Sequence, residues 1–191
     1  MGRFAMIGLI ALSLLSIPIF LRQTVAAQAP GLENPLIVEK SQGEVRFWRP
    51  IPSDTAAVQK LTHFVIKVDR RNGGSPDFWF GTETMPAGGE IPYHRHLHED
   101  EMLYLATGTA HVHVGPLEGD AHAGAIVFIP RDTWVTVRNI GKTPVLFLFA
   151  FNAPSFDRYM RCESVPPGQP VQRMTAQEDK SCEKLGDVQY R

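Results

Sequence analysis

The sequence predicts an all-β protein that folds as a sandwich or a barrel. The 191-residue chain contains many short runs of apolar, aromatic and β-branched residues, a composition that is typical of strands. Gly, Pro, Asn and Asp separate these runs at short, regular intervals, as they do in β-sandwiches and barrels. The length suits one domain with a substantial core.

The first 27 residues have the pattern of an export signal peptide. A basic residue, Arg3, precedes an apolar stretch at positions 4–21, and residues 25–27 offer small side chains for cleavage. An uncleaved membrane anchor is the alternative, because an apolar run of roughly 18 residues is about long enough to cross a bilayer. We therefore expect a periplasmic or secreted domain, or one that is membrane-anchored outside the cytoplasm. A linker, residues 28–35, follows.

The first part of the barrel region, which we place at residues 36–154, should contain four strands and one helical turn. Residues 61–68 are rich in β-branched side chains, which favour strands. Residues 78–85 follow a turn rich in Gly, Asn and Pro and place Phe and Thr on one face. The expected elements are strands at 36–38, 44–48, 61–68 and 78–85 and a helical turn at 54–60.

The second part of the barrel region should contain further short strands. Residues 125–129 and 145–151 are continuous apolar runs, which indicate strands. In residues 109–114 the apolar side chains share one face, which should line the interior, and two histidines share the other. The expected elements are strands at 101–106, 109–114, 125–129, 135–139 and 145–151 and a polar loop at 118–122.

Residues 155–191 form a C-terminal tail with short helical segments. Residues 156–161 predict one helical turn. Thr175 and Glu178 stand three apart in the pattern of a capping box, which opens a helix. We expect Gly186 to end that helix.

The only two cysteines of the chain, Cys162 and Cys182, lie in this tail. In an oxidising compartment such a pair usually forms a disulfide. The bond would close a loop of about twenty residues, for which loop entropy gives roughly 3 kcal/mol of stabilisation. Two free thiols with a redox role are the alternative. Because the chain has no CxxC spacing, we expect a structural disulfide.

The charge pattern excludes a nucleic-acid-binding surface. The chain has 19 basic and 20 acidic residues and a formal net charge of −1, without the clustered Lys and Arg that nucleic-acid binding requires. It contains neither a Gly-rich phosphate loop nor a serine elbow. The sequence therefore does not indicate nucleic acid as a partner.

The most informative stretch holds three histidines within five residues, followed closely by a carboxylate. Side chains two apart in a strand share a face, so His94 and His96 should point the same way, and His98 too if the strand runs that far. The acidic pair Glu99-Asp100 then suggests a turn. A second strand after this turn would bring Glu101 back beside the histidines in a hairpin. Two imidazoles and one carboxylate resemble the ligand set of non-haem iron enzymes.

These residues also belong to a longer pattern. Gly88, His94, His96, Glu101 and Gly108 follow the spacing Gly-x5-His-x-His-x4-Glu-x6-Gly. This stretch resembles the first motif of the cupin superfamily, and the resemblance extends over roughly residues 32–154. It implies a jelly roll, the double-stranded β-helix barrel. It also implies a divalent transition metal, Fe(II), Mn(II), Zn(II) or Ni(II), bound by His94, His96 and Glu101.

The second cupin motif is matched only in part. Gly124, Pro130 and Asn139 are in register, but Asp132 replaces the usual Gly and Val135 replaces the His that is usually a fourth metal ligand. Valine cannot bind a metal, so the site must use three protein ligands, recruit a substitute, or be vestigial. The candidate substitutes are His98, His111 and His113, of which His98 is sterically the best placed.

Two functions are consistent with this pattern. The first is a metal-dependent enzyme, similar to small single-domain cupin dioxygenases, although no general base is evident in the sequence. The second is a non-catalytic cupin that binds a small ligand or a partner. An intact first motif favours the enzyme, and Val135 favours the binding protein. Many cupins dimerise, so a homodimer is consistent with either function.

Overall fold

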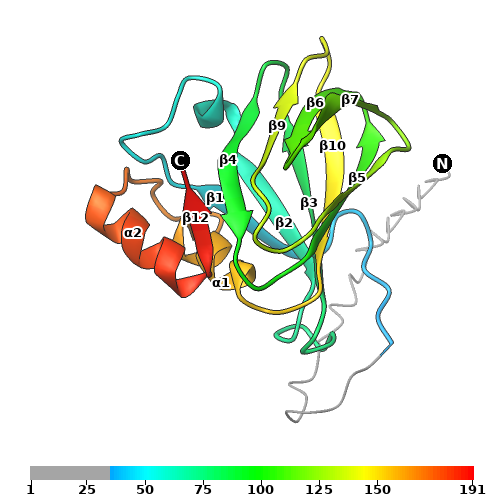
Figure 1. Ribbon diagram of the computed structural model, residues 1–191. Helices are drawn as coiled ribbons and strands as arrows, with labels where there is room; N and C mark the ends of the chain where they lie inside the picture. The colour runs from blue at the N-terminus through cyan, green and yellow to red at the C-terminus, as the bar shows by residue number, and fades with distance from the viewer. Residues whose placement is uncertain (1–34) are drawn as a thin grey trace, which may run out of the picture. The chain divides into compact units, whose positions relative to one another are not determined.

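The computed structural model describes residues 35–191, and two antiparallel β-sheets make up most of this part of the chain (Figure 1). The predicted all-β jelly roll is confirmed, since both sheets contribute to one hydrophobic core and helices are few. The predicted signal segment, residues 1–27, and almost all of the predicted linker lie outside the described residues. Among residues 35–191, no helix has the length and apolar character needed to span a membrane.

The first sheet has seven strands in the order β11-β1-β2-β3-β10-β5-β8. Their bounds are β1 Glu44–Trp48, β2 His63–Val68, β3 Trp79–Met85, β5 Glu101–Thr107, β8 Ile126–Ile129, β10 Val145–Phe151 and β11 Ser164–Val165. The interior strand β10 contributes three phenylalanines to the core, Phe147, Phe149 and Phe151. A Cβ on Gly81, which lies opposite Phe149, would come within 2.3 Å of that ring. The glycine therefore makes room for the aromatic core.

The second sheet has five strands in the order β12-β4-β9-β6-β7. Their bounds are β4 Glu90–His96, β6 Thr109–Val114, β7 Leu117–His122, β9 Val135–Asn139 and β12 Val188–Tyr190. On β6, the three apolar side chains are buried and the two histidines are only partly buried, as the alternation predicts. This sheet carries both histidines of the predicted metal site on β4.

Three sequence-based expectations are wrong. Residues 36–38 form no strand, and Ile37 is 90% exposed, because this segment has no neighbouring strand to pair with. Residues 118–122 are not a loop but most of β7, which pairs with β6 along its whole length. A strand at the edge of a sheet can be polar on both faces, because neither face has to be buried. The C-terminal strand β12 was not predicted at all.

The third error concerns the metal-site hairpin. β4 and β5 do follow each other with a short turn between them, but they belong to different sheets. β4 pairs with β9 and β12, whereas β5 pairs with β10 and β8. The chain therefore crosses from one sheet to the other between His96 and Glu101.

The C-terminal tail adds an edge strand to each sheet. Helix α1 (Phe156–Cys162) leads to β11, which pairs with β1, and helix α2 (Ala176–Leu185) leads to β12, which pairs with β4 (Figure 1). The predicted capping box is confirmed, because the Thr175 hydroxyl accepts from the Glu178 N–H and the Glu178 carboxylate accepts from the Thr175 N–H. Gly186 ends α2, as expected.

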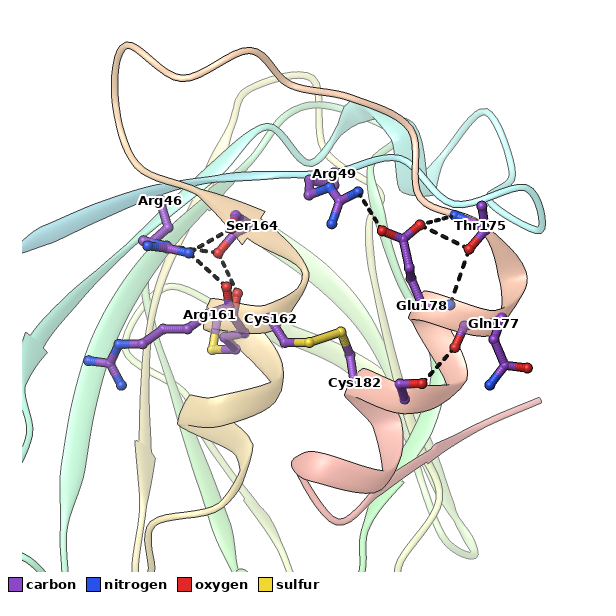
Figure 2. Close-up of a disulfide and its surroundings, with 11 residues drawn as sticks. Arg46, Arg49, Arg161, Cys162, Ser164, Thr175, Gln177, Glu178 and Cys182 are labelled. Atoms are coloured by element: carbon purple, nitrogen blue, oxygen red, sulfur yellow. Dashed lines mark hydrogen bonds and ion pairs between the residues drawn. A yellow bond between two sulfur atoms is a disulfide. The ribbon is translucent and has the colours of Figure 1, made fainter.

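The predicted disulfide is confirmed. Cys162 at the end of α1 is bonded to Cys182 in α2, 20 positions later (Figure 2). The Arg46 side chain on β1 donates hydrogen bonds to the carbonyl oxygens of Arg161 and Ser164, beside the disulfide (Figure 2). The disulfide thus joins the two helices of the tail to each other, and the hydrogen bonds from Arg46 attach the tail to β1.

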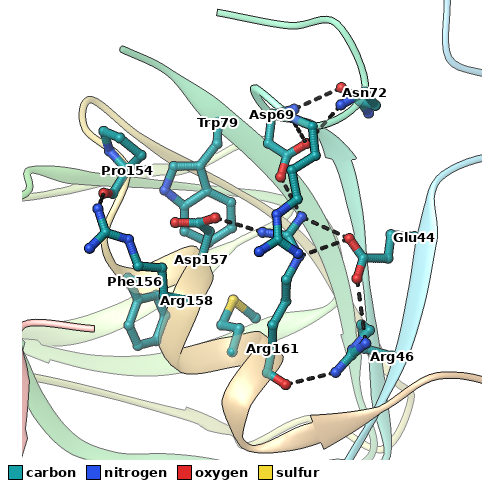
Figure 3. Close-up of polar contacts among 12 residues, drawn as sticks. Glu44, Arg46, Asp69, Asn72, Trp79, Pro154, Phe156, Asp157, Arg158 and Arg161 are labelled. Atoms are coloured by element: carbon teal, nitrogen blue, oxygen red, sulfur yellow. Dashed lines mark hydrogen bonds and ion pairs between the residues drawn. The ribbon is translucent and has the colours of Figure 1, made fainter. Parts of the chain in front are cut away.

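A buried ionic cluster attaches α1 to the seven-stranded sheet (Figure 3). Arg161 is only 9% exposed and pairs with Asp157 at 2.6 Å, with Glu44 at 2.7 Å and with Asp69. Asp157 and Asp69 are themselves buried. Buried charges are tolerated when they are paired in this way, so this cluster sets the position of α1 against the barrel.

Candidate metal centre

The three predicted metal ligands meet at the same point of the barrel interior. His94 and His96 point inward from β4, and Glu101 points inward from the first position of β5. Each residue offers one ligand atom, and these atoms all lie within 4.8 Å of one another. All three side chains are buried, at 5%, 2% and 6% exposure. Among the described residues this is the one cluster of His, Cys, Asp and Glu with metal-ligand spacing.

The polar atoms of this cluster lack protein partners. Both ring nitrogens of His96 and the Oε2 atom of Glu101 are buried and form no hydrogen bond with the described part of the chain, although His96 Nε2 lies 3.2 Å from that Oε2. Buried polar atoms without partners are rare. The Nδ1 atom of His94 lies 2.8 Å from the Pro92 carbonyl oxygen, an arrangement that leaves Nε2 available as a ligand. This donor set fits a divalent transition metal.

Burial also places the two imidazoles in the protonation state that binds metals. Burial, followed by the charge of His96, lowers the pKa of His94 to about 4. Burial lowers the pKa of His96 to about 3. Burial raises the pKa of Glu101 to about 7, against the effect of His94. Both histidines are therefore neutral at neutral pH, as ligation requires.

Aromatic side chains enclose the cluster. The Phe156 ring lies 4.3 Å from the His96 ring, and the Phe151 ring lies 4.9 Å from it, both measured between centroids. The Tyr190 ring stacks on the His94 ring at 5.5 Å. Phe156 and Tyr190 come from the tail, and sequence reasoning missed both because nothing in the local pattern relates them to the histidines.

Glu99 and Asp100 stabilise the turn that connects β4 to β5. Glu99 is 1% exposed and accepts hydrogen bonds from the Phe156 N–H at 2.7 Å and from the Ser155 hydroxyl, and burial raises its pKa to about 7. Asp100 accepts two hydrogen bonds from the Arg131 side chain, which hold the pKa of Asp100 well below its usual range. Neither carboxylate joins the cluster, so both stabilise the turn.

None of the three candidate substitutes supplies a fourth ligand. His98 is exposed, with its Nδ1 atom 3.7 Å from Asp187, because the strand ends at His96 and the turn has already begun. His111 pairs with Asp120 and Glu118 on the sheet surface. His113 contacts the Tyr93 hydroxyl, also away from the cluster.

The two departures from the second motif have different structural consequences. Asp132 adopts a φ of +60°, in the left-handed region that favours glycine, and it pairs with Arg95 at 2.8 Å. Aspartate tolerates this conformation better than most residues, so the turn is retained. Val135 is fully buried, lies directly opposite His94 in the β4–β9 register and lines the cavity. The fourth ligand position is thus occupied by an apolar side chain.

A cavity of about 440 Å³ adjoins the cluster. Its wall includes His94, Glu101 and Val135, and most of the remaining buried wall is apolar. The apolar members include Trp48, Ile51, Leu61, Ile91, Leu103, Val137, Phe147, Phe149, Phe151, Phe156 and Met160. Its size falls in the range of small-molecule sites.

The same cavity contains carboxyl groups that sequence reasoning missed. Glu83 points inward from β3, and Glu163, Asp179 and Glu183 line another part of the wall together with Tyr159. Burial, together with the neighbouring carboxyl group of Asp179, raises the pKa of Glu163 to about 9. The signal for Glu83 was available, because it shares the inward phase of its strand with Trp79 and Met85.

Comparisons with known proteins support the fold. A family model described as "Cupin domain" matches residues 81–151. A solved structure from Thermotoga maritima, described as a predicted oxalate decarboxylase, is 17% identical with a TM-score of 0.51, and the match covers 62% of this chain and 99% of that chain. No curated protein matches the sequence.

Two further solved structures match with lower TM-scores. The cupin domain of Cnp3 from Schizosaccharomyces pombe is 24% identical at a TM-score of 0.45, with 58% of this chain and 76% of that chain covered. KdgF from a Halomonas species is 13% identical at 0.43, with 51% and 84% covered.

Proposed function

The barrel of this chain is a cupin domain, and we propose that it binds one divalent transition-metal ion through His94, His96 and Glu101. The observation that carries this proposal is that three buried side chains bring their ligand atoms together. Both ring nitrogens of His96 and the Oε2 atom of Glu101 form no hydrogen bond with the described part of the chain. Two neutral imidazoles and one carboxylate suit Fe(II), Mn(II), Zn(II) or Ni(II). The bound metal would supply a Lewis acid and a template with open coordination positions.

We further propose that the metal acts on a small molecule in the adjoining cavity, in a metal-dependent oxidoreductase reaction of the dioxygenase type. The residues of this chain would orient the ligands and exclude water. The Pro92 carbonyl fixes the orientation of the His94 ring, and the rings of Phe151 and Phe156 keep solvent from His96. A dry site strengthens electrostatic interactions with a bound molecule.

A non-catalytic ligand-binding cupin is the second candidate. Val135 favours it, because this residue fills the fourth ligand position and no other histidine among the described residues replaces it. A site with three protein ligands binds a metal less tightly than a site with four. Lower metal affinity would suit a protein that uses its barrel only to bind a ligand.

The deciding experiment is the metal content of the protein purified without a histidine tag. We expect about one transition-metal ion per chain and its loss in His94→Ala. The matched control is His98→Ala, which removes an exposed histidine two positions away and should leave the metal content unchanged. Equal metal content in wild type and both variants would show that the site lies elsewhere.

If metal binds, oxygen consumption with phenolic, sugar and carboxylic acid substrates separates the two candidates. Turnover that depends on the metal supports the enzyme. Saturable ligand binding without turnover supports the binding protein.

We also propose that the domain functions outside the cytoplasm. The Cys162–Cys182 disulfide supports this proposal, because such bonds persist in oxidising compartments. Mass spectrometry of the N-terminus of the protein recovered from cells would test cleavage after residue 27.

A further inference from the structure

Glu83 is an acidic residue at a buried position of strand β3. β3 alternates between buried and half-buried side chains, and its buried positions are Trp79, Gly81, Glu83 and Met85. Glu83 lies between Phe64 of β2 and Phe147 of β10 in the sheet register. It is 5% exposed. A carboxyl group in such apolar surroundings costs stability unless it is hydrogen-bonded.

Only one hydrogen bond from the described residues compensates for this burial. The Trp48 indole N–H donates to Glu83 Oε1 at 2.8 Å. Burial raises the pKa of Glu83 to about 8 in spite of this bond, and the charge of Glu101 adds to the effect. The indole bond engages one oxygen of the carboxyl group and therefore leaves acceptor capacity for another donor.

Glu83 lines the same cavity as two of the proposed metal ligands. Glu83, Trp48, His94 and Glu101 all line its wall. The three inward phenylalanines of β10 lie in the same wall. A ligand that approaches the metal ligands would therefore rest on aromatic rings and have a buried carboxyl group within the same cavity.

The basic side chains of the cavity wall all contact other side chains of the protein. They are Arg49, Lys180 and Arg191, and none of them is buried. Arg49 pairs with Glu178 at 3.3 Å, Lys180 pairs with Glu183 at 2.6 Å, and Arg191 stacks over Trp134 at 4.1 Å. A metal ion held by His94, His96 and Glu101 would then be the cation of the buried wall, and a ligand carboxylate would meet that ion rather than Glu83.

We propose that this cavity binds ligands with an apolar body and a hydroxyl or amino group that donates a hydrogen bond to Glu83. The inference rests on the proposed function, since it concerns the ligand of the same site, and it assigns Glu83 the recognition of the donor group.

The test uses three probes that share one apolar body and differ in their head group: 2-phenylethylamine, 2-phenylethanol and 3-phenylpropionate. Each is titrated into zinc-loaded, nitrogen-15-labelled protein. The readout is the indole N–H resonance of Trp48, because that group donates to Glu83. The indole resonances of Trp79 and Trp134 serve as internal references.

We expect the amine and the alcohol to shift the Trp48 resonance and 3-phenylpropionate to leave it in place. Glu83→Gln should weaken binding of the amine at least tenfold and change the dissociation constant of 3-phenylpropionate by less than twofold. The glutamine amide keeps an acceptor for Trp48 but cannot form a carboxylate beside the ammonium group of the amine. Glu163→Gln, in another part of the same wall, is the matched control and should leave amine binding unchanged.

A Trp48 shift by 3-phenylpropionate equal to that by the amine would overturn the proposal. So would an unchanged amine affinity in Glu83→Gln, or a larger loss in Glu163→Gln. The zinc content of each sample keeps this test separate from the proposed function. Zinc bound without a Trp48 shift refutes only the ligand class, whereas absent zinc refutes the metal site and leaves the titration interpretable in metal-free protein.

Discussion

Replacing Arg161 with methionine should cause a large loss of stability. Arg161 is 9% exposed and is the shared partner of Asp157, Asp69 and Glu44 (Figure 3). Methionine has similar length but no charge, so Arg161→Met leaves two buried aspartates without a counter-charge. Breaking a buried pair by removing one partner costs about 3–5 kcal/mol.

Urea denaturation would measure this loss. With a slope of about 2 kcal/mol per molar urea, a loss of about 4 kcal/mol lowers the midpoint by roughly 2 M. Asp69→Asn added to Arg161→Met should recover part of the stability, because it removes one of the unpaired charges. The metal content should fall as well, because Phe156 on the same helix covers His96.

The matched control is Arg131→Met. Arg131 also pairs with an aspartate, Asp100, at 2.8 Å, but its side chain is 54% exposed. Exposed pairs contribute about 0–1 kcal/mol, so the midpoint should move by no more than roughly 0.5 M. Equal midpoint shifts for Arg161→Met and Arg131→Met would refute the conclusion that the buried cluster anchors α1.

Three further predictions concern other parts of the molecule. Val135→His should tighten zinc binding at least tenfold, because position 135 lies opposite His94 and faces the cavity; unchanged affinity in a competition titration with a chelator would show that the side chain does not reach the metal. The double variant Cys162→Ser, Cys182→Ser should lose about 3 kcal/mol of unfolding free energy, and a urea midpoint equal to that of the oxidised wild type would contradict this. The pKa of Glu163 is raised from its ordinary value of 4.5 to about 9, so its contribution to stability is fully present below pH 4.5 and is lost as the pH rises to about 9. Thermal unfolding of wild type and Glu163→Gln should therefore diverge over that interval, and parallel pH profiles would show that the group is not shifted.

Much of the barrel could be predicted because strand positions that face the core must be apolar. The strands at 44–48, 109–114, 135–139 and 145–151 were predicted with their observed bounds. In the last three of them, burial of one or both faces dictates which positions are apolar. The ligand trio was predicted as a group because two histidines separated by one residue must share a face of a strand.

The rest depends on contacts that no local pattern encodes. Sequence proximity suggested that His96 and Glu101 meet within a hairpin, whereas they meet across the gap between two sheets. The polar strand β7 has no buried face and therefore no alternation to detect. The roles of Phe156 and Tyr190 follow from the docking of the tail, which is a long-range event.

The pairing of β12 with β4 has a consequence for the order in which the site can form. Gln189 hydrogen-bonds to Arg95 across 94 positions of sequence, and its neighbour Tyr190 stacks on His94. During synthesis the ribosome has delivered all three ligands long before it delivers this closing strand. A nascent chain halted before residue 188 would therefore present half-covered histidines, open to whichever ion is most abundant around it. Selection of the ion in the proposed metal site would then be a late step of maturation, and a fusion partner attached after Arg191 would begin at the rim of the cavity.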